Sequence, residues 1–336
     1  MMRSAAVAGL ALLALSITSH SAPGPKIVIG QSAPLSGTAA DVGRDIRDGA
    51  LAYFAKVNKA GGINGREIEL VTLDDMNDRK RAGANAKRLL DESNAMALFG
   101  FASATLSMDA IPLAEAKGVA HWANFGVNRM AVLHYDDEVG RVNYETVAKL
   151  VKTQGQAPLQ VAVKRGAKVD PRAFEAILKY DPQVIIVTTQ MPPVVELLQA
   201  MGAAGKAYPV SALSFVNPDE LAAAPGGVAK GTTVMQVVPN PRNVNVPVVK
   251  ECAEAMKEAN GTLNYTTLES CIAAKVLVEA IRKAGKSPTP QSIVASLEGM
   301  SRYDAGGFVV AFSKEDHHGS SWTDFSILSR GGSYRH

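Results

Sequence analysis

The residues of this sequence best suited to binding chemistry form a loop of small and hydroxyl-bearing side chains, Ala102 to Ser107. The loop follows an apolar stretch, Ala97–Gly100, and precedes apolar residues at helical spacing between Leu106 and Lys117. Backbone amides at the start of a helix carry partial positive charge, so such a loop suits a carboxylate. Ordinary capping of the helix by Thr105 or Ser107 is the alternative that the spacing alone favours.

Three clusters of acidic or histidine side chains have residue types that bind metals. Asp74-Asp75 and Asp136-Asp137-Glu138 follow apolar strand candidates, and Asp316-His317-His318 lies near the C-terminus. None has a second group of ligands in register with it, and a metal site needs several converging side chains. We interpret these clusters as solvated turns or helix caps, and expect neither a metal nor another cofactor.

Catalytic sequence motifs are missing. The sequence contains no Gly-x-Ser-x-Gly, no phosphate-loop signature and no Gly-x-Gly-x-x-Gly after a strand. Its two cysteines, Cys252 and Cys271, lie in helical patterns without a neighbouring histidine that would activate a thiol. We therefore do not expect an enzyme, and a hydrolase stays only as a rival hypothesis. For the cysteines, a disulfide and two separate buried thiols remain open alternatives.

Composition excludes several classes of partner. The chain has 336 residues, of which 47% are apolar and 20% charged, so two domains with full cores are expected. The net charge is only +3 and no basic stripe is visible, which argues against nucleic acid and anionic membranes as partners. An aromatic content of 6% also argues against a stacking platform for bases.

The first residues have the pattern of a secretory signal peptide. Arg3 gives a weakly positive start, Ala5 to Ile17 is almost uninterruptedly apolar, and small residues follow up to Ala22. The apolar run is too short to cross a bilayer. We expect residues 1–21 to be removed and the mature chain to be soluble in the periplasm. No cysteine near the cleavage point offers a lipid anchor, and a buried N-terminal helix is the alternative interpretation.

Strand and helix patterns alternate along the mature chain. Lys26–Gly30 predicts a strand, and apolar residues at helical spacing from Val42 to Asn58 predict the helix after it. The further strands expected are 67–73, 96–100, 118–122, 130–134, 159–163, 184–188, 210–213, 232–237, 308–312 and 324–328, and the further helices are 79–92, 106–117, 144–152, 172–179, 194–201, 248–259, 267–284 and 290–297. This alternation predicts an α/β fold with two lobes, each a mostly parallel sheet flanked by helices.

Several segments, in order along the chain, resemble the branched-chain amino acid (Leu/Ile/Val)-binding protein family of ABC transporters. The matching segments are Gln31–Gly37, Asn58–Arg66, Asp74-Asp75, Leu98–Gly100, Ile111–Glu115, Tyr135–Asp137, Pro182–Val187, Val237–Pro239, Leu268-Glu269, Ala273–Leu277 and Tyr303–Gly307. The resemblance covers nearly the whole mature chain. It is specific for the family and not for the ligand.

The resemblance implies the type I periplasmic-binding-protein fold, in which two hinged lobes close on a small ligand. It implies lobes at 26–122 plus about 240–318, and at 124–238 plus about 320–336. Ser103, Ala104 and Thr105 match the segment that holds the ligand carboxylate in the family, and Leu35 lies in the loop after the first strand. The implied partners are an amino acid or related carboxylate and a permease of the inner membrane.

The sequence departs from the family at three places. Trp122 and Met130 are closer than the dozen or so residues that a parallel crossover takes, which indicates a deletion near residues 122–126 of about one strand–helix unit, expected in the second lobe. Val139 and Met191 stand where the family has aromatic residues of the cleft. With fewer donors for a zwitterion, we expect weak or altered binding. A sensory protein of the same fold and a decayed copy are the alternatives.

Overall fold

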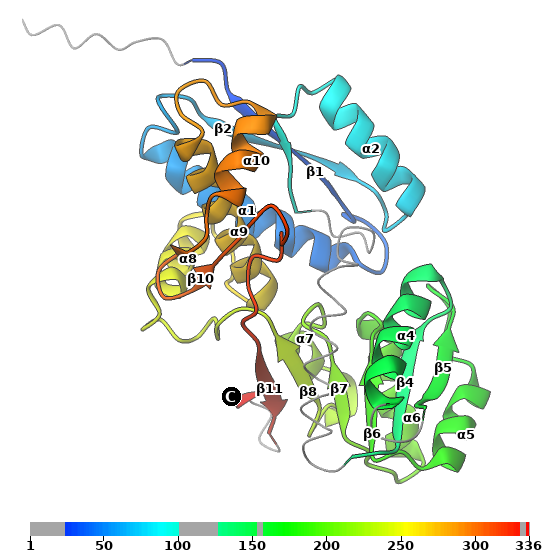
Figure 1. The fold of residues 1–336 in the computed structure, drawn as a ribbon. Coiled ribbons are helices and arrows are strands. Elements are labelled where there is room, and N and C mark those ends of the chain that lie inside the picture. The colour runs from blue at the N-terminus through cyan, green and yellow to red at the C-terminus, as the bar shows by residue number, and fades with distance from the viewer. Residues whose placement is uncertain (1–23, 101–126, 153–156, 330–333, 336) are drawn as a thin grey trace, which may run out of the picture.

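Two lobes make up the structure, a computed structural model that describes residues 24–100, 127–152, 157–329 and 334–335. Figure 1 draws the first lobe above the second. Each lobe contains its own buried apolar core, one formed mainly by residues 27–63 and 238–310 and the other by residues 131–234 and Leu328. The α/β fold class predicted from the sequence is confirmed.

The described part of the first lobe contains a parallel sheet with helices packed against it. Its strands lie in the order β2-β1-β3, and both pairings are parallel. The strands are β1 (Ile27–Ala33), β2 (Ile68–Asp74) and β3 (Ala97–Leu98), and the helices are α1 (Ala40–Lys59), α2 (Arg79–Asp91), α8 (Pro247–Glu258), α9 (Tyr265–Lys283) and α10 (Pro290–Glu298). A separate antiparallel pair, β9 (Tyr303–Asp304) and β10 (Val309–Val310), follows α10.

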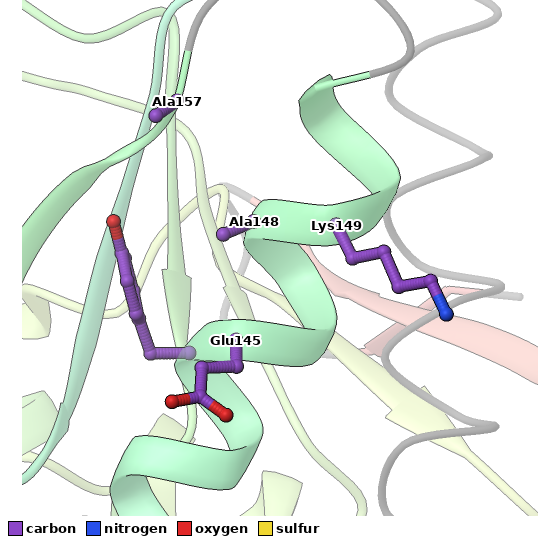
Figure 2. Close-up of a pocket in the computed structure, with 5 residues that line it drawn as sticks. Glu145, Ala148, Lys149 and Ala157 are labelled. Carbon is purple, nitrogen blue, oxygen red and sulfur yellow. The ribbon is translucent and has the colours of Figure 1, made fainter.

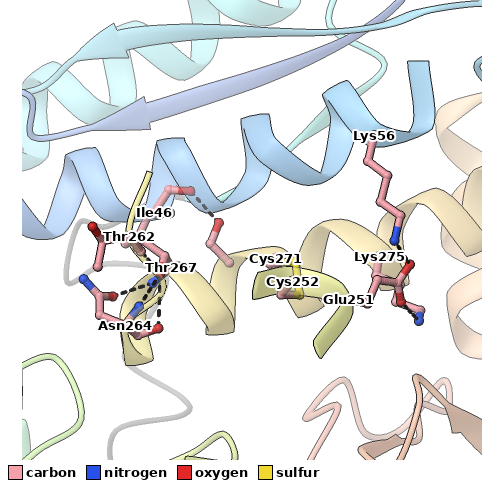
Figure 3. Close-up of a disulfide and its surroundings, with 10 residues drawn as sticks. Ile46, Lys56, Glu251, Cys252, Thr262, Asn264, Thr267, Cys271 and Lys275 are labelled. Atoms are coloured by element: carbon pink, nitrogen blue, oxygen red, sulfur yellow. Dashed lines mark hydrogen bonds and ion pairs between the residues drawn. A yellow bond between two sulfur atoms is a disulfide. The ribbon is translucent and has the colours of Figure 1, made fainter. Parts of the chain in front are cut away.

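Helices α1, α8 and α9 are tied to one another inside the first lobe (Figure 3). A disulfide joins Cys252 of α8 to Cys271 of α9, so of the two alternatives left open by the sequence the structure has the bridge. Both cysteines are fully buried. Glu251 accepts hydrogen bonds from Lys56 of α1, at 2.9 Å, and from Lys275 of α9. One carboxylate therefore links all three helices.

The second lobe is a larger sheet in the order β12-β11-β8-β7-β6-β4-β5. Its five parallel strands are β4 (Met130–Tyr135), β5 (Leu159–Val163), β6 (Val184–Val187), β7 (Val210–Ala212) and β8 (Thr233–Gln236), and the antiparallel ones are β11 (Asp324–Leu328) and β12 (Tyr334–Arg335). The helices are α4 (Glu138–Lys152), α5 (Pro171–Tyr180), α6 (Met191–Ala203) and α7 (Pro218–Ala222), followed by the 3-10 turn Pro225–Gly227.

Strand β4 shows why the parallel strands of this sheet have apolar residues on both faces. Ala131 and Leu133 point into one core, and Met130 and Val132 into a second, smaller one on the opposite face. All six residues of the strand are buried. A parallel strand covered by helices on both faces has this continuous apolar pattern instead of an alternating one.

The structure corrects some details of the sequence-based expectation. Residues 144–152, expected to be part of a helix, form the later portion of α4, which begins at Glu138, and the five-residue α7 was not predicted. The described second-lobe sheet is hydrogen-bonded without a gap from β5 to β12, so the strand expected to be missing leaves no break in it. Within the described ranges, no helix is long and apolar enough to cross a membrane.

Candidate ligand-binding cleft

The loop after β1 is fastened to the end of β2. Asp74 accepts a hydrogen bond from the Leu35 amide at 2.8 Å and one from the Ser36 hydroxyl at 2.6 Å. Leu35, a candidate ligand contact, is half-buried there. Desolvation by itself would raise the pKa of Asp74, but these bonds and one from the Met76 amide outweigh it and hold the pKa below its usual value. The loop is thus organised around an ionised carboxylate.

A buried polar network also stabilises the carboxyl ends of β1 and β2. The Ser32 hydroxyl donates to Asp75 at 2.9 Å, and the Asn85 amide of α2 donates to the Ser32 oxygen at 3.1 Å. Asp75 is inaccessible to solvent, and this desolvation raises its pKa. The residue types alone suggested solvated turns or helix caps for this acidic pair, and for Asp75 this expectation was wrong. Its buried carboxylate, together with Ser32 and Asn85, ties β1, β2 and α2 together.

The second lobe places an aromatic and cationic cluster at the carboxyl end of β4. The Arg165 guanidinium lies 3.8 Å from the centre of the Tyr135 ring and pairs with Asp137 at 2.7 Å. The Tyr135 hydroxyl accepts a hydrogen bond from the backbone N–H of Gln190 at 3.3 Å. Desolvation raises the pKa of Tyr135 even though Arg165 acts in the opposite direction. Sequence analysis missed this cluster because its members come from three separate β–α connections.

Val139 and Met191 lie at the same edge, in the first turns of α4 and α6. Both are half-buried, and Met191 packs against the second-lobe core. Gly140 follows Val139, and a Cβ at this glycine would lie 1.9 Å from the Tyr135 carbonyl oxygen. The close approach of helix and strand therefore requires glycine and fixes the position of the first turn of α4, in which Val139 is the second residue.

Buried polar atoms without partners mark the carboxyl ends of two further strands. Thr189 follows β6, is inaccessible to solvent, and its hydroxyl makes no hydrogen bond. Gln236 ends β8, is 1% exposed, and neither atom of its amide is paired. An unpaired buried polar group costs about 1–3 kcal/mol. Such groups need a partner, and at this edge of a parallel sheet a ligand or an ordered water is the natural one.

One carboxylate of the first lobe has no partner among the described residues. Glu269 lies one turn into α9, where solvent reaches its side chain although its neighbours on both sides are buried. Tyr265, one turn earlier on the same side of the helix, bonds to Ser326 of β11 at 3.1 Å. This side of α9 therefore faces the second lobe.

The two edges approach each other. Arg79, the first residue of α2, forms an ion pair of 2.6 Å with Glu138, the first residue of α4. Because α2 follows β2 and α4 follows β4, the contact brings the carboxyl ends of β2 and β4 towards each other where the two lobes meet. Ligands of open α/β sheets bind at such edges.

A hollow of about 310 Å³ lies elsewhere, along the outer side of α4. Figure 2 shows Glu145, Ala148 and Lys149 of α4 beside Ala157, which precedes β5. Tyr144 completes the lining. This hollow is separate from the strand ends, and we do not assign the ligand to it.

The sequence-predicted contacts divide into two groups. Leu35, Val139 and Met191 lie at the carboxyl edges of the sheets. Ser103, Ala104 and Thr105 lie outside the described residues, so the proposed carboxylate contact stays a prediction. Within the described parts of the chain, no group of three or more histidine, cysteine, aspartate or glutamate residues is arranged to hold a metal ion.

The sequence pattern of the periplasmic binding protein family matches residues 26–123 and 107–326. This chain belongs to that family. The two matched segments overlap at 107–123, so the match is broken in the same part of the chain where a deletion is predicted.

Some relatives of this periplasmic binding protein match most of its length, whereas an amino acid binding protein of Pseudomonas aeruginosa matches only 28% of it, at 36% identity. The leucine-, isoleucine-, valine-, threonine- and alanine-binding protein of Pseudomonas aeruginosa is 24% identical over 328 residues, which covers 85% of this chain and 86% of that protein. A substrate-binding periplasmic protein from Ralstonia solanacearum is 26% identical with a TM-score of 0.84, covering 92% of this chain and 99% of that one. An extracellular ligand-binding receptor from Verminephrobacter eiseniae is 25% identical with a TM-score of 0.80, covering 93% and 100%.

Proposed function

We propose that this chain is the extracytoplasmic solute-binding subunit of an ABC importer. The observation that carries the proposal is the family match from residue 26 to residue 326, on a structure in which the carboxyl ends of β2 and β4 approach each other where the two lobes meet. Residues 1–21 act as the signal for export to the periplasm. The lobes consist of 26–122 with about 240–318, and of 124–238 with about 320–336. The protein performs no chemistry on its ligand and delivers it to a membrane permease.

The proposed ligand is a small amino acid or related carboxylate. The amides and hydroxyls of Ser103–Thr105 bind its carboxylate, in keeping with the partial positive charge of a helix start. The unpaired hydroxyl of Thr189 and amide of Gln236 offer hydrogen bonds from the second lobe. The Pseudomonas relative is named for binding leucine, isoleucine, valine, threonine and alanine, which supports a small or aliphatic amino acid as the first ligand to test.

Binding of branched-chain amino acids is expected to be weak. Val139 and Met191 cannot donate the hydrogen bonds or the aromatic surface that the family places in the cleft. Each ligand polar group left unpaired costs about 1–3 kcal/mol, or roughly one to two orders of magnitude in the dissociation constant.

A thermal-shift screen over aliphatic amino acids, amides, urea and aromatic acids tests the proposal, because a ligand that binds only the folded state raises the melting temperature. At least one class is expected to stabilise the mature protein, and calorimetry then gives its affinity. Stabilisation by none of these classes would contradict solute binding. Sub-micromolar affinity for leucine or valine would contradict the prediction of weak binding but not the proposed function.

The double variant Val139→Tyr, Met191→Tyr tests the role of the two departures. It is expected to bind leucine at least tenfold more tightly than the unmodified chain. Val294→Tyr is the matched control, since Val294 is 48% exposed on α10, away from the strand ends. Equal affinities for the double variant and the unmodified chain would show that neither residue limits binding.

A further inference from the structure

The first turn of α2 is unusually basic for the start of a helix. Arg79, Lys80 and Arg81 follow one another there, and all three are exposed. Cations at a helix N-terminus oppose the helix dipole, which favours negative charge at that end. Asp78 caps the helix through the Arg81 amide at 2.8 Å, and Lys80 has no ion pair with the described residues. The turn as a whole keeps a net positive charge.

The facing turn of the second lobe has the opposite charge. Asp136, Asp137 and Glu138 lead from β4 into α4. Arg165 pairs with Asp137 at 2.7 Å, while Asp136 is exposed and has no ion pair with the described residues. Glu138 reaches across to the first lobe instead of to a neighbour in its own. Glu138 therefore contacts the basic turn directly, and Asp136 adds a second negative charge two residues before it.

These two turns meet only when the lobes are close. The Arg79–Glu138 pair joins residues that lie 59 positions apart, one in each lobe. It is the contact that a hinge opening would break, because the first residue of α2 and the first residue of α4 move apart with their sheets. Attraction across the mouth of the interlobe space therefore favours the closed arrangement.

We propose that the basic turn Arg79–Arg81 and the acidic turn Asp136–Glu138 form an electrostatic latch that biases the free protein towards closure. The two side chains of the pair are 61% and 59% exposed, so salt screens their attraction. An exposed pair of this kind changes an equilibrium by about two- to fivefold. The latch thus tunes the population of closed molecules and does not lock them. It is a property of the ligand-free chain and does not depend on which solute is bound.

Distances between spin labels on the two lobes test the latch. Labels at Lys257→Cys on α8 and Lys179→Cys on α5 occupy exposed positions in the first and second lobes. The native cysteines are buried in their disulfide, so only the introduced thiols react. The interlobe distance distribution is measured by pulsed electron resonance at low and high salt, without ligand.

Arg79→Glu and Glu138→Arg are each expected to lower the closed-to-open ratio by about fivefold or more, because charge reversal replaces attraction by repulsion. The double exchange restores the ratio to within about twofold of the unmodified chain. High salt shifts the unmodified chain towards longer distances and both single variants towards shorter ones, because it screens attraction in the former and repulsion in the latter. Arg141→Glu is the control: Arg141 forms a 2.6 Å pair with Glu145 inside α4, with both side chains 58% exposed.

The proposal is overturned if either single reversal gives the same distribution as Arg141→Glu, or if the double exchange fails to restore closure. A distribution of the unmodified chain that is insensitive to salt would also overturn it. Melting temperatures of the variants identify any that fold poorly. A variant that folds poorly is replaced by Arg79→Gln or Glu138→Gln, which only remove a charge. These substitutions are expected to lower the closed-to-open ratio as well, but by less than the charge reversals. Ligand binding is scored separately, so failure of the latch leaves the proposed function untouched.

Discussion

The two lobes begin in the same way and are held together differently. In each, the helix after the first strand passes so close to the strand end that only glycine fits. A Cβ at Gly43 of α1 would lie 1.9 Å from the Pro34 carbonyl oxygen, and one at Gly140 of α4 would lie 1.9 Å from that of Tyr135. The first lobe then adds the Cys252–Cys271 disulfide, and both cysteines of the chain are used there.

The described ties of the two lobes are of different kinds. In the first lobe, the disulfide and the Glu251 carboxylate join α1, α8 and α9 directly to one another. In the second lobe, the described strands form one continuous sheet of seven. The difference teaches that ties between helices and strand pairing can both hold the lobes of one fold together.

The largest expected effect comes from removing the bridge. The double variant Cys252→Ala, Cys271→Ala is expected to lower the free energy of unfolding of the first lobe by about 2–4 kcal/mol, because the cross-link no longer restricts the unfolded chain. Hydrogen exchange followed by mass spectrometry resolves the two lobes. Exchange should rise in α8 and α9 and stay unchanged in β4 and β6.

Reducing agent provides the control for this variant. It should accelerate exchange in the unmodified protein and have no effect on the double variant, which contains no thiol. Equal loss of protection in both lobes would break the comparison, since it would mean that the lobes unfold as one cooperative unit.

An intermediate effect is expected from the two glycines. Gly43→Ala and Gly140→Ala each force the helix start away from the strand end, and overpacking of this kind costs about 1–3 kcal/mol. The loss is confined to the first lobe for Gly43→Ala and to the second for Gly140→Ala. Lobe-resolved hydrogen exchange measures both.

Gly83 gives the matched control. It lies inside α2, and a Cβ there meets nothing within 4 Å. Gly83→Ala is expected to stabilise the first lobe by about 0.5–1 kcal/mol, because alanine has the higher helix propensity. A stabilising Gly140→Ala would show that the second lobe absorbs the extra atom.

The smallest effect concerns the carboxylate that joins three helices. Desolvation would raise the pKa of Glu251, but hydrogen bonds from Lys275 and Lys56 lower it below its usual value. A carboxyl group whose pKa is lower in the folded state stabilises the fold above its unfolded pKa, and this contribution is lost as the pH falls through the folded value. Glu251→Gln should cost about 1 kcal/mol at neutral pH and almost nothing near pH 3.

Glu258→Gln is the control for Glu251. Glu258 also lies on α8 and pairs with Lys59 of α1 at 2.8 Å, but both side chains are more than half exposed. Denaturant unfolding at the two pH values should show little change for Glu258→Gln. A pH-independent loss for Glu251→Gln would mean that packing, and not the charge, is what Glu251 supplies.

Local patterns were sufficient to predict most elements. The apolar spacing from Val42 to Asn58 gave a helix within two residues of α1, and Leu159–Val163 coincides with β5. Patterns of this kind depend on residues only a few positions apart in the sequence. The covalent chain keeps such residues close together, so the pattern can be recognised without knowledge of the fold. The short α7 was missed because five residues, with a proline at the start, give too little periodicity to recognise.

Only part of the candidate site could be predicted from the sequence. Val139 and Met191 were found because they replace aromatic residues in a family pattern. Tyr135, Arg165 and Gln190 were not, because the sequence holds no signal for a contact between residues 30 or 55 positions apart. The unpaired Thr189 and Gln236 needed knowledge of burial, which a single sequence does not give.

By itself, then, the sequence determined the alternation of strands and helices, the α/β class and the family, since each depends on residue order and short-range spacing. Only the tertiary structure decided that Cys252 meets Cys271, that Asp75 is buried while Asp74 holds the neighbouring loop, and that Arg79 meets Glu138 across the lobes. Such contacts follow from how packed helices and sheets bring distant segments together, and their energies depend on burial that arises only after folding.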